Sequence, residues 1–438
     1  MTDLHLDITA GFDRALFWEG GDSVRNLVVR LTARRTAEGS ATPRKPLNIA
    51  LVIDASGSMS GGKLEAAKSA AIGLAERLGP EDRLTLVSFA SDVRVHLDAV
   101  PVTSERSRDI CHAIAHLETR GSTNLSGGWF AGVDCAARVA EARPDLMARV
   151  IILSDGHANV GISSAPVLWE HAAELRNRGV LTSTLGIGDG YDEGLLRGIA
   201  ENGGGRLHDA ELTQEIASVL LGELDDIHGA ALEDVRLMID LPPSTRIEPY
   251  GSRRITREEG GLGLALGALV DGIERSVVFK VTCPRAEAGT ALRFDVSASG
   301  RPVEGGVRVS ASAAPAILRA ATGRENEAQA RDTPLSRIVA RAWSAHVTAR
   351  AAEMNRERNL TDAVDYVMRE FRHFERYVAG LDLGPEILRD LDILRRNISR
   401  PLSSRANKEM FVQASLSMES RIDRRGPGKA AWSARIEE

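Results

Sequence analysis

Residues 47–59 read Leu-Asn-Ile-Ala-Leu-Val-Ile-Asp-Ala-Ser-Gly-Ser-Met. The first seven residues are almost wholly apolar, which is typical of a strand buried on both faces of a parallel sheet. The run ends on Asp54, and Ser56 and Ser58 follow at alternate positions. Because open α/β sheets bind their ligands beyond the carboxyl ends of their strands, this stretch predicts one corner of a metal site.

Strand and helix patterns alternate on the C-terminal side of this stretch. Helical faces are predicted at 64–78, 105–117, 125–143 and 167–178, and strands at 84–89, 150–153 and 180–187, with an added edge strand at 93–102. Repeated βα units of this kind predict a doubly wound, mostly parallel sheet. We assign residues 46–224 to this α/β domain.

The flanking segments have different patterns. Residues 4–34 contain two strand-like runs, and residues 230–311 are strand-like with frequent turns. We expect both to belong to one discontinuous β-sandwich, residues 1–45 and 229–312, into which the α/β domain is inserted. From about Pro315 the apolar period becomes helical, so residues 313–438 are expected to form a helical C-terminal region with a frayed tail from Ser420.

Composition excludes some classes of protein. The 438 residues carry a formal charge of −6, which argues against nucleic acid as a partner. Cys111, Cys135 and Cys283 lie far apart, the N-terminus lacks a signal-like pattern, and no apolar run approaches the roughly 18–20 residues of a membrane helix. These features predict a cytoplasmic protein without a membrane partner.

Two further oxygen donors, Thr123 and Asp155, fall in loops that the predicted topology places near the same end of the sheet as Asp54. Carboxylate and hydroxyl oxygens are hard ligands, which suit Mg²⁺, with Mn²⁺ as the alternative. Two aspartates and three hydroxyls leave such an ion under-neutralised. Because Mg²⁺ keeps water ligands, one position remains for a carboxylate from another protein.

Three loops carry a family resemblance: Asp54-Ala-Ser-Gly-Ser-Met, Gly121-Ser-Thr-Asn-Leu and Ile152-Leu-Ser-Asp-Gly-His-Ala-Asn-Val-Gly. They resemble the metal-ion-dependent adhesion site (MIDAS) of von Willebrand factor type A domains, and Thr184-Leu-Gly-Ile-Gly-Asp-Gly looks like the bacterial members. The resemblance covers about residues 46–224. All five ligand positions of the family are present: Asp54, Ser56, Ser58, Thr123 and Asp155.

The resemblance implies a non-enzymatic, Mg²⁺-dependent protein-binding module of bacterial type. Ser56, Ser58 and Thr123 would contact the ion directly, and the two aspartates would act partly through water. The partner would be a protein that offers an Asp or Glu side chain to the metal. An AAA+ ATPase or a component of a bacterial signalling or defence system is the kind of partner that the family suggests.

Several residues keep more than one interpretation. Asp189 is a candidate for contacting the residues that hold the ion without contacting the ion itself, although a role in the turn fits it equally well. His157, close to Asp155, is either a softer ligand or a solvated loop histidine. Ser and Asp after a strand can also simply cap the next helix.

Other functions remain as alternatives. Gly57 to Lys63 matches most of a Gly-x-x-x-x-Gly-Lys phosphate loop, but Leu64 stands where that motif needs Ser or Thr. A nucleotide hydrolase at this loop, or a metal hydrolase at Asp54 and Asp155, is therefore one alternative. Another is an accessory subunit of a chelatase-like machine whose ATPase is a different polypeptide.

Overall fold

The computed structural model describes residues 4–35, 45–156, 158–251, 255–258, 261–418 and 432–437. These residues fall into two compact units. The first holds the described residues between 41 and 229, and the second holds those before 41 and from 230 onward. The N-terminal strands therefore share a unit with the C-terminal half of the chain.

One six-stranded sheet forms the centre of the first unit, in the order β6-β5-β4-β7-β8-β9. Neighbouring strands pair in parallel, except the edge strand β6, which is antiparallel to β5. The predicted doubly wound, mostly parallel sheet is thus confirmed. The strands are β4 (Leu47–Asp54), β5 (Arg83–Phe89), β6 (Val93–Pro101), β7 (Met147–Ser154), β8 (Val180–Ile187) and β9 (Gly204–Ala210).

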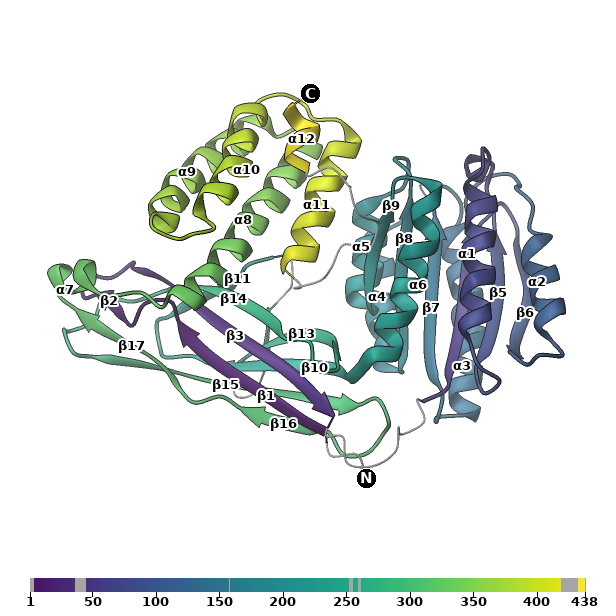
Figure 1. The fold of residues 1–438 in the computed structure, drawn as a ribbon, viewed down its shortest axis with the longest axis horizontal. Helices are drawn as coiled ribbons and strands as arrows, with labels where there is room; N and C mark the ends of the chain where they lie inside the picture. The colour runs from purple at the N-terminus through teal and green to yellow at the C-terminus, as the bar shows by residue number, and fades with distance from the viewer. Residues whose placement is uncertain are drawn as a thin grey trace. The chain divides into compact units, whose positions relative to one another are not determined.

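Helices cover both faces of this sheet (Figure 1). Helices α3 (Leu125–Ala142), α4 (Ala165–Asn177) and α5 (Glu193–Asn202) share one hydrophobic core with the central strands, in which Trp129 is fully buried. On the other face, α1 (Lys63–Arg77) contacts both α6 (Thr213–Gly229) and α2 (Ser107–Ala115). A short 3₁₀ turn, Gly57–Met59, lies between β4 and α1.

Two sheets make up most of the second unit, in the orders β1-β3-β14-β11 and β12-β13-β10-β15-β17-β2, with β16 beside β15. Their strands pair antiparallel, except that β2 is parallel to β17. One hydrophobic cluster contains side chains from both sheets, including Leu27 of β3 and Phe294 of β15. The strands are β1 (Leu4–Phe12), β2 (Leu16–Trp18), β3 (Val24–Arg35), β10 (Ala230–Asp240), β11 (Arg246–Pro249), β12 (Ile255–Glu258), β13 (Gly261–Val270), β14 (Arg275–Thr282), β15 (Ala291–Pro302), β16 (Val309–Ser312) and β17 (Ala316–Ala321).

The helical part of the second unit has its own core, in which Phe374 is fully buried. Helix α8 also packs on the four-stranded sheet, where Val339 meets Val28 and Val278. The helices are α7 (Gly323–Ala328), α8 (Thr333–Arg356), α9 (Leu360–Val378), α10 (Gly384–Asn397), α11 (Ser404–Met418) and α12 (Trp432–Glu437). A C-terminal helical region is therefore confirmed.

The structure differs from the sequence prediction at both ends of that region. Residues Ala316–Ala321 form strand β17 although helix was predicted from about residue 315. The segment is rich in helix-forming residues, but alternate side chains such as Leu318 are buried against β15 and β2, so pairing outweighs local propensity. Within the tail predicted to fray, α12 buries Trp432 and Ile436; the rest of that tail lies outside the described residues.

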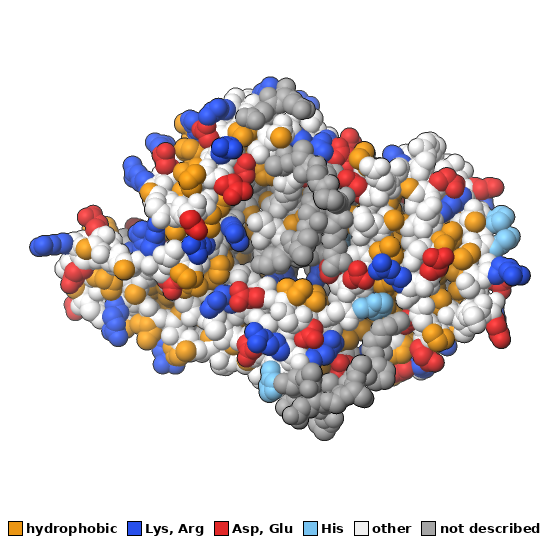
Figure 2. All heavy atoms as spheres, in the orientation of Figure 1, with side chains coloured by type: hydrophobic (Ala, Val, Ile, Leu, Met, Phe, Trp, Pro, Cys, Tyr) orange, Lys and Arg blue, Asp and Glu red, His pale blue; other side chains and the backbone are white. Residues whose placement is uncertain are grey.

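Charges of both signs are interspersed over the face of the molecule seen in Figure 2. This is expected from a sequence with 55 Lys and Arg and 61 Asp and Glu. Among the described residues, no helix is long and apolar enough to span a bilayer.

Candidate metal centre

The candidate centre lies where the strand order of the six-stranded sheet reverses. The chain runs from β4 outward to β6, and then crosses to β7 on the other side of β4. Ile53 pairs with Leu153, so β4 and β7 end side by side. Asp54 at the end of β4 and Asp155 directly after β7 therefore lie at the same edge of the sheet. Such a switch point at the carboxyl edge is where open α/β sheets bind ligands.

A chain of hydrogen bonds joins the first and third loops. Asp54 Oδ1 accepts the backbone N–H of Ser56 at 2.9 Å, and Asp54 Oδ2 accepts the hydroxyl of Ser154 at 2.7 Å. The Ser56 and Ser58 hydroxyl oxygens are 3.0 Å apart, and Ser58 donates to Asp155 Oδ1 at 2.7 Å. Four of the five predicted ligands are therefore linked directly.

Thr123 reaches the same place from the second loop. A Cβ atom built on Gly156 would lie 3.6 Å from both the Ser58 Oγ and the Thr123 Oγ1, so the two hydroxyls face one small space. The Thr123 N–H donates to Asn159 Oδ1 at 2.8 Å, which ties the second loop to the third. The Gly57 N–H donates to the Gly121 carbonyl at 3.0 Å, which ties the first loop to the second.

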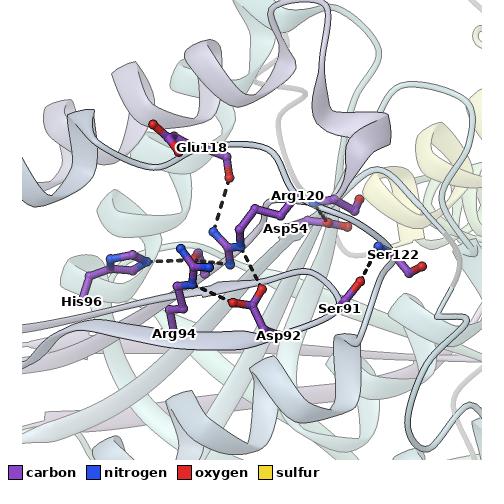
Figure 3. Close-up of polar contacts among 10 residues, drawn as sticks. Asp54, Ser91, Asp92, Arg94, His96, Glu118, Arg120 and Ser122 are labelled. Carbon is purple, nitrogen blue, oxygen red and sulfur yellow. Dashed lines mark hydrogen bonds and ion pairs between the residues drawn. The ribbon is translucent and has the colours of Figure 1, made fainter.

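Arg120 anchors the second loop to the β5–β6 hairpin (Figure 3). Its Nε donates to Asp92 Oδ1 at 2.8 Å, and its Nη2 donates to the Ser88 hydroxyl at 3.0 Å, beside His96. Its backbone N–H donates to the Ala55 carbonyl at 2.5 Å. One residue therefore fixes the position of Thr123 relative to the strand that ends at Asp54.

Two buried acids face each other in this site. Asp54 is fully buried and Asp155 is 1% exposed. Burial raises the pKa of Asp54, the Asp155 charge raises it further, and the hydrogen bonds from Ser154 and Ser56 oppose the rise. The Lys63 ammonium lies 2.5 Å from Asp155 Oδ2 and provides one positive charge. The site thus concentrates negative charge, which favours a bound cation.

The donors present fit a hard divalent ion. The described residues contain no cluster of three His, Cys, Asp or Glu side chains arranged to hold a metal, so a site here must rely on hydroxyl ligands. Three hydroxyls and two carboxylates converge at one corner, all of them oxygen donors of the kind that Mg²⁺ and Mn²⁺ accept. In this structure the Lys63 ammonium provides the positive charge beside the Asp155 carboxylate.

The structure locates the other candidates as well. Asp189 is exposed in the turn after β8, next to Gly188, whose built Cβ would lie 3.6 Å from Lys63 Cε. His157 lies outside the described residues. Sequence reasoning missed the roles of Ser154, Lys63 and Arg120, because their bonds to Asp54, Asp155 and Asp92 join segments far apart in the chain and leave no local signal.

Comparison with known proteins agrees with this fold. Residues 48–219 match the sequence model of the von Willebrand factor type A domain. The chain is 27% identical over 275 residues to the uncharacterized protein sll0103 of Synechocystis, covering 59% of this chain and 64% of that one. It is 30% identical over 201 residues to the uncharacterized protein YfbK of Escherichia coli, covering 45% of this chain and 34% of that one.

A solved structure, the von Willebrand factor type A protein from Catenulispora acidiphila, matches with a TM-score of 0.68 at 17% identity, over 96% of this chain and 97% of that one. The similarity in fold therefore extends beyond the α/β unit. Residues 48–219 of the chain thus form a von Willebrand factor type A domain. Such domains are generally non-enzymatic modules for protein–protein interaction, and they commonly hold a divalent metal.

Proposed function

We propose that this protein binds Mg²⁺ at a metal-ion-dependent adhesion site and, through that ion, captures an acidic side chain of a partner protein. The observation that carries the proposal is the hydrogen-bonded chain Asp54–Ser56–Ser58–Asp155, with Thr123 facing the same space. Asp54, Ser56, Ser58, Thr123 and Asp155 would hold the ion, with Mn²⁺ as an alternative to Mg²⁺. When bound, the ion supplies a Lewis-acidic position for an external carboxylate.

The residues of the chain have distinct parts in this function. Asp54 orients the first loop, since one of its oxygens accepts the Ser56 N–H and the other is held by Ser154. Ser58 is exposed, so its hydroxyl lies at the mouth of the site, where a partner can approach. Arg120 holds the second loop in register. Asp189 is our candidate for supporting the ligand residues, since its neighbour Gly188 lies beside Lys63.

The partner is a protein with an Asp or Glu in an accessible position, because a carboxylate is a hard oxygen ligand that suits the remaining position on a divalent ion. Following the family, we expect it within an intracellular bacterial assembly for signalling or defence, with an AAA+ ATPase as one candidate. The chain spans 64% and 34% of the lengths of the two curated relatives described above, and neither name specifies a partner.

The geometry gives less support to the hydrolase alternatives. In a phosphate loop the lysine must reach the nucleotide, but Lys63 is bound to Asp155 and to the Ser58 carbonyl at 3.3 Å. A chelatase-like accessory subunit would use the same metal-dependent contact, so it differs from our proposal only in the partner.

We infer in addition that the von Willebrand factor type A domain, residues 46–224, interrupts a β-sandwich made of residues 1–45 and 229–312, followed by a helical region, residues 313–438. The pairing of β3 with β14 and the cluster that both sheets share support a sandwich that is continuous across the insertion. Strand β17 would extend the sandwich to Ala321.

A cytoplasmic location is consistent with the cysteines. Cys111, Cys135 and Cys283 are all free thiols. Burial raises the pKa of both Cys135 and Cys283 to about 11, so neither is a reactive thiolate at neutral pH. Fractionation of cells that express the tagged chain tests the location.

The function is tested by capture of partners from the native host in Mg²⁺ and in chelator. The unmodified protein is compared with Asp54→Ala and Thr123→Ala, and Ser122→Ala is the matched control because Ser122 is exposed beside Thr123. We expect a partner that is retained by the unmodified protein and by Ser122→Ala in Mg²⁺, and lost in chelator and in both site variants. If the partner is also retained in chelator and by both site variants, the proposal is contradicted.

A further inference from the structure

The second unit contains a cavity of about 680 Å³ between the sheet β1-β3-β14-β11 and helices α8 and α9. A volume of this size is within the range of small-molecule pockets. Every residue that lines it belongs to the second unit, so the cavity includes none of the residues of the candidate metal centre. The proposed function therefore leaves it unexplained.

Aromatic side chains form much of the wall. The Tyr250 and Trp343 rings are nearly parallel, with centroids 6.3 Å apart, and Tyr377 lies 5.4 Å from Trp343. The ring of His346 is 5.4 Å from Tyr250. Planar rings prefer offset or edge contacts at these spacings, so a planar ligand finds compatible surfaces here. Tyr366 extends this aromatic wall along α9.

Two acids of the cavity wall, Asp13 and Glu370, have partners within the protein, and Glu370 lies 3.7 Å from the Arg369 guanidinium. Asp13 accepts two hydrogen bonds from Asn26, at 3.1 and 3.2 Å, and one from the Tyr377 hydroxyl at 2.9 Å. Glu370 accepts the Trp343 indole N–H at 2.9 Å. These carboxylates therefore do not need a cation from a ligand, and they hold the aromatic side chains in place.

Two buried donors, in contrast, lack acceptors. The Arg14 Nε and the Tyr366 hydroxyl are both buried, and neither makes a hydrogen bond with a described residue. Leaving a buried donor unpaired destabilises the folded protein. Burial and the nearby Glu370 charge raise the pKa of Tyr366, so its hydroxyl keeps its proton and remains a donor. Both residues line the cavity, and although these two atoms are themselves closed to solvent, the unpaired groups of the wall are donors.

The charged side chains of the cavity wall also favour a ligand that accepts hydrogen bonds. Arg25 is only 7% exposed, and its guanidinium donates to the Leu16 and Val24 carbonyls and to Asn326, all of them neutral acceptors. The lining contains five basic side chains, Arg14, Arg25, Lys280, Arg369 and Arg376, against three acidic ones, Asp13, Glu248 and Glu370. A local excess of positive charge in a chain of net charge −6 favours an anionic ligand.

We propose that this cavity binds a small aromatic oxyanion, an aromatic carboxylate or phosphate ester, whose ring packs among Tyr250, Trp343 and Tyr377 and whose acid group accepts from Arg14. The Tyr366 hydroxyl, in the same cavity wall, donates to a second acceptor of the ligand. The ligand binds independently of the metal centre.

Calorimetric titration with matched probe pairs tests the inference on the full chain, in buffer that contains a chelator. The carboxylate pair is 2-aminobenzoate against 2-aminobenzamide, and the phosphate pair is adenosine 5′-monophosphate against adenosine. We expect at least one acid to bind at concentrations up to about 1 mM and its neutral counterpart to bind at least about tenfold more weakly. The pair that shows the difference identifies the acid group.

Two variants locate the binding. Arg14→Gln should weaken the acid about tenfold or more, because a hydrogen bond to a charged group is lost. Tyr366→Phe should weaken it severalfold while the unfolding temperature stays unchanged or rises, because its hydroxyl has no hydrogen-bond partner among the described residues. Arg372→Gln, an exposed position on the same helix, is the control.

The outcomes of this experiment are decisive. Failure of all four probes to bind overturns the proposal, as does equal binding of an acid and its neutral counterpart or binding that both variants leave unchanged. Asp54→Ala, which disables the proposed metal centre, should bind the acid normally. A loss in that variant would show that the binding belongs to the metal centre and would also overturn the proposal.

Discussion

The ammonium nitrogen of Lys63 lies 2.5 Å from Oδ2 of Asp155, a carboxylate that is almost completely buried. Lys63 begins α1 and Asp155 follows β7, so this ion pair connects the loops that follow two adjacent strands. A divalent ion held by Asp155 must share this carboxylate with Lys63 or displace it. Lys63 therefore stabilises the metal-free domain and, because it competes for Asp155, lowers the affinity of the domain for metal.

Lys63→Met keeps much of the side-chain length and removes the charge. We expect Mg²⁺ affinity to rise about tenfold or more, since a hydrogen bond to a charged group contributes about 1.5–3 kcal/mol. In chelator the unfolding temperature should fall, because Asp155 is left buried without a cation. Calorimetry and thermal unfolding measure the two effects. Lys68→Met, which removes an ion pair with the exposed Glu65, is the control, and weaker Mg²⁺ binding by Lys63→Met would contradict the competition.

Thr123 offers a test of the hydroxyl alone. Thr123→Val keeps the shape of the side chain and removes the oxygen, whereas Thr123→Ser keeps the oxygen. We expect Thr123→Val to lower Mg²⁺ affinity by about 100-fold, at the upper end of the effects seen when residues that only support a metal site are removed. Thr123→Ser should bind within severalfold of the unmodified protein. Equal affinities for the two variants in calorimetry would remove Thr123 from the ligand set.

Arg120 should act through the position of the second loop. Arg120→Gln removes the bonds to Asp92 and Ser88, so we expect weaker Mg²⁺ binding and a fall in unfolding temperature of about 2–4 °C. Arg94→Gln is the matched control, because Arg94 also pairs with Asp92 but is mostly exposed. If both variants bind Mg²⁺ like the unmodified protein, Arg120 does not position the site.

His96 predicts a pH dependence of stability. Burial, together with the charges of Arg120 and Arg94, lowers the pKa of His96 below its usual value of 6.5. The unfolded chain therefore takes up this proton at a higher pH than the folded chain does. Stability should decrease as the pH falls below about 6.5, and the decrease should level off below the folded-state pKa.

His96→Gln should reduce this dependence, because an amide can still accept from the Ser88 hydroxyl but does not titrate. Urea unfolding at pH 7.5 and pH 5.5 gives the free-energy difference for each protein. The exposed His112 of α2 supplies the control variant His112→Gln. An unchanged difference between the two pH values in His96→Gln would refute the assignment.

The sequence by itself determined the features that rest on local pattern. The apolar run of β4 ends at Asp54, and β7 is followed directly by Asp155. Period-3.6 apolar spacing marked helices such as α3 to within a residue or two. The five predicted ligands occupy three short loops with recognisable residue types. These features could be predicted because burial of a strand, or the turn after it, depends mainly on the residues within it.

Only the tertiary structure decided which distant groups meet. Ala316–Ala321 forms a strand because it pairs with β15 on one side and β2 on the other. Lys63 pairs with Asp155 although the two residues are 92 positions apart in the chain. The cavity is formed by residues from the loop before β2, from β14 and from two helices, and its unpaired donors are visible only once all are packed. Contacts between segments far apart in the chain depend on topology and packing, for which the sequence of either segment alone carries no signal.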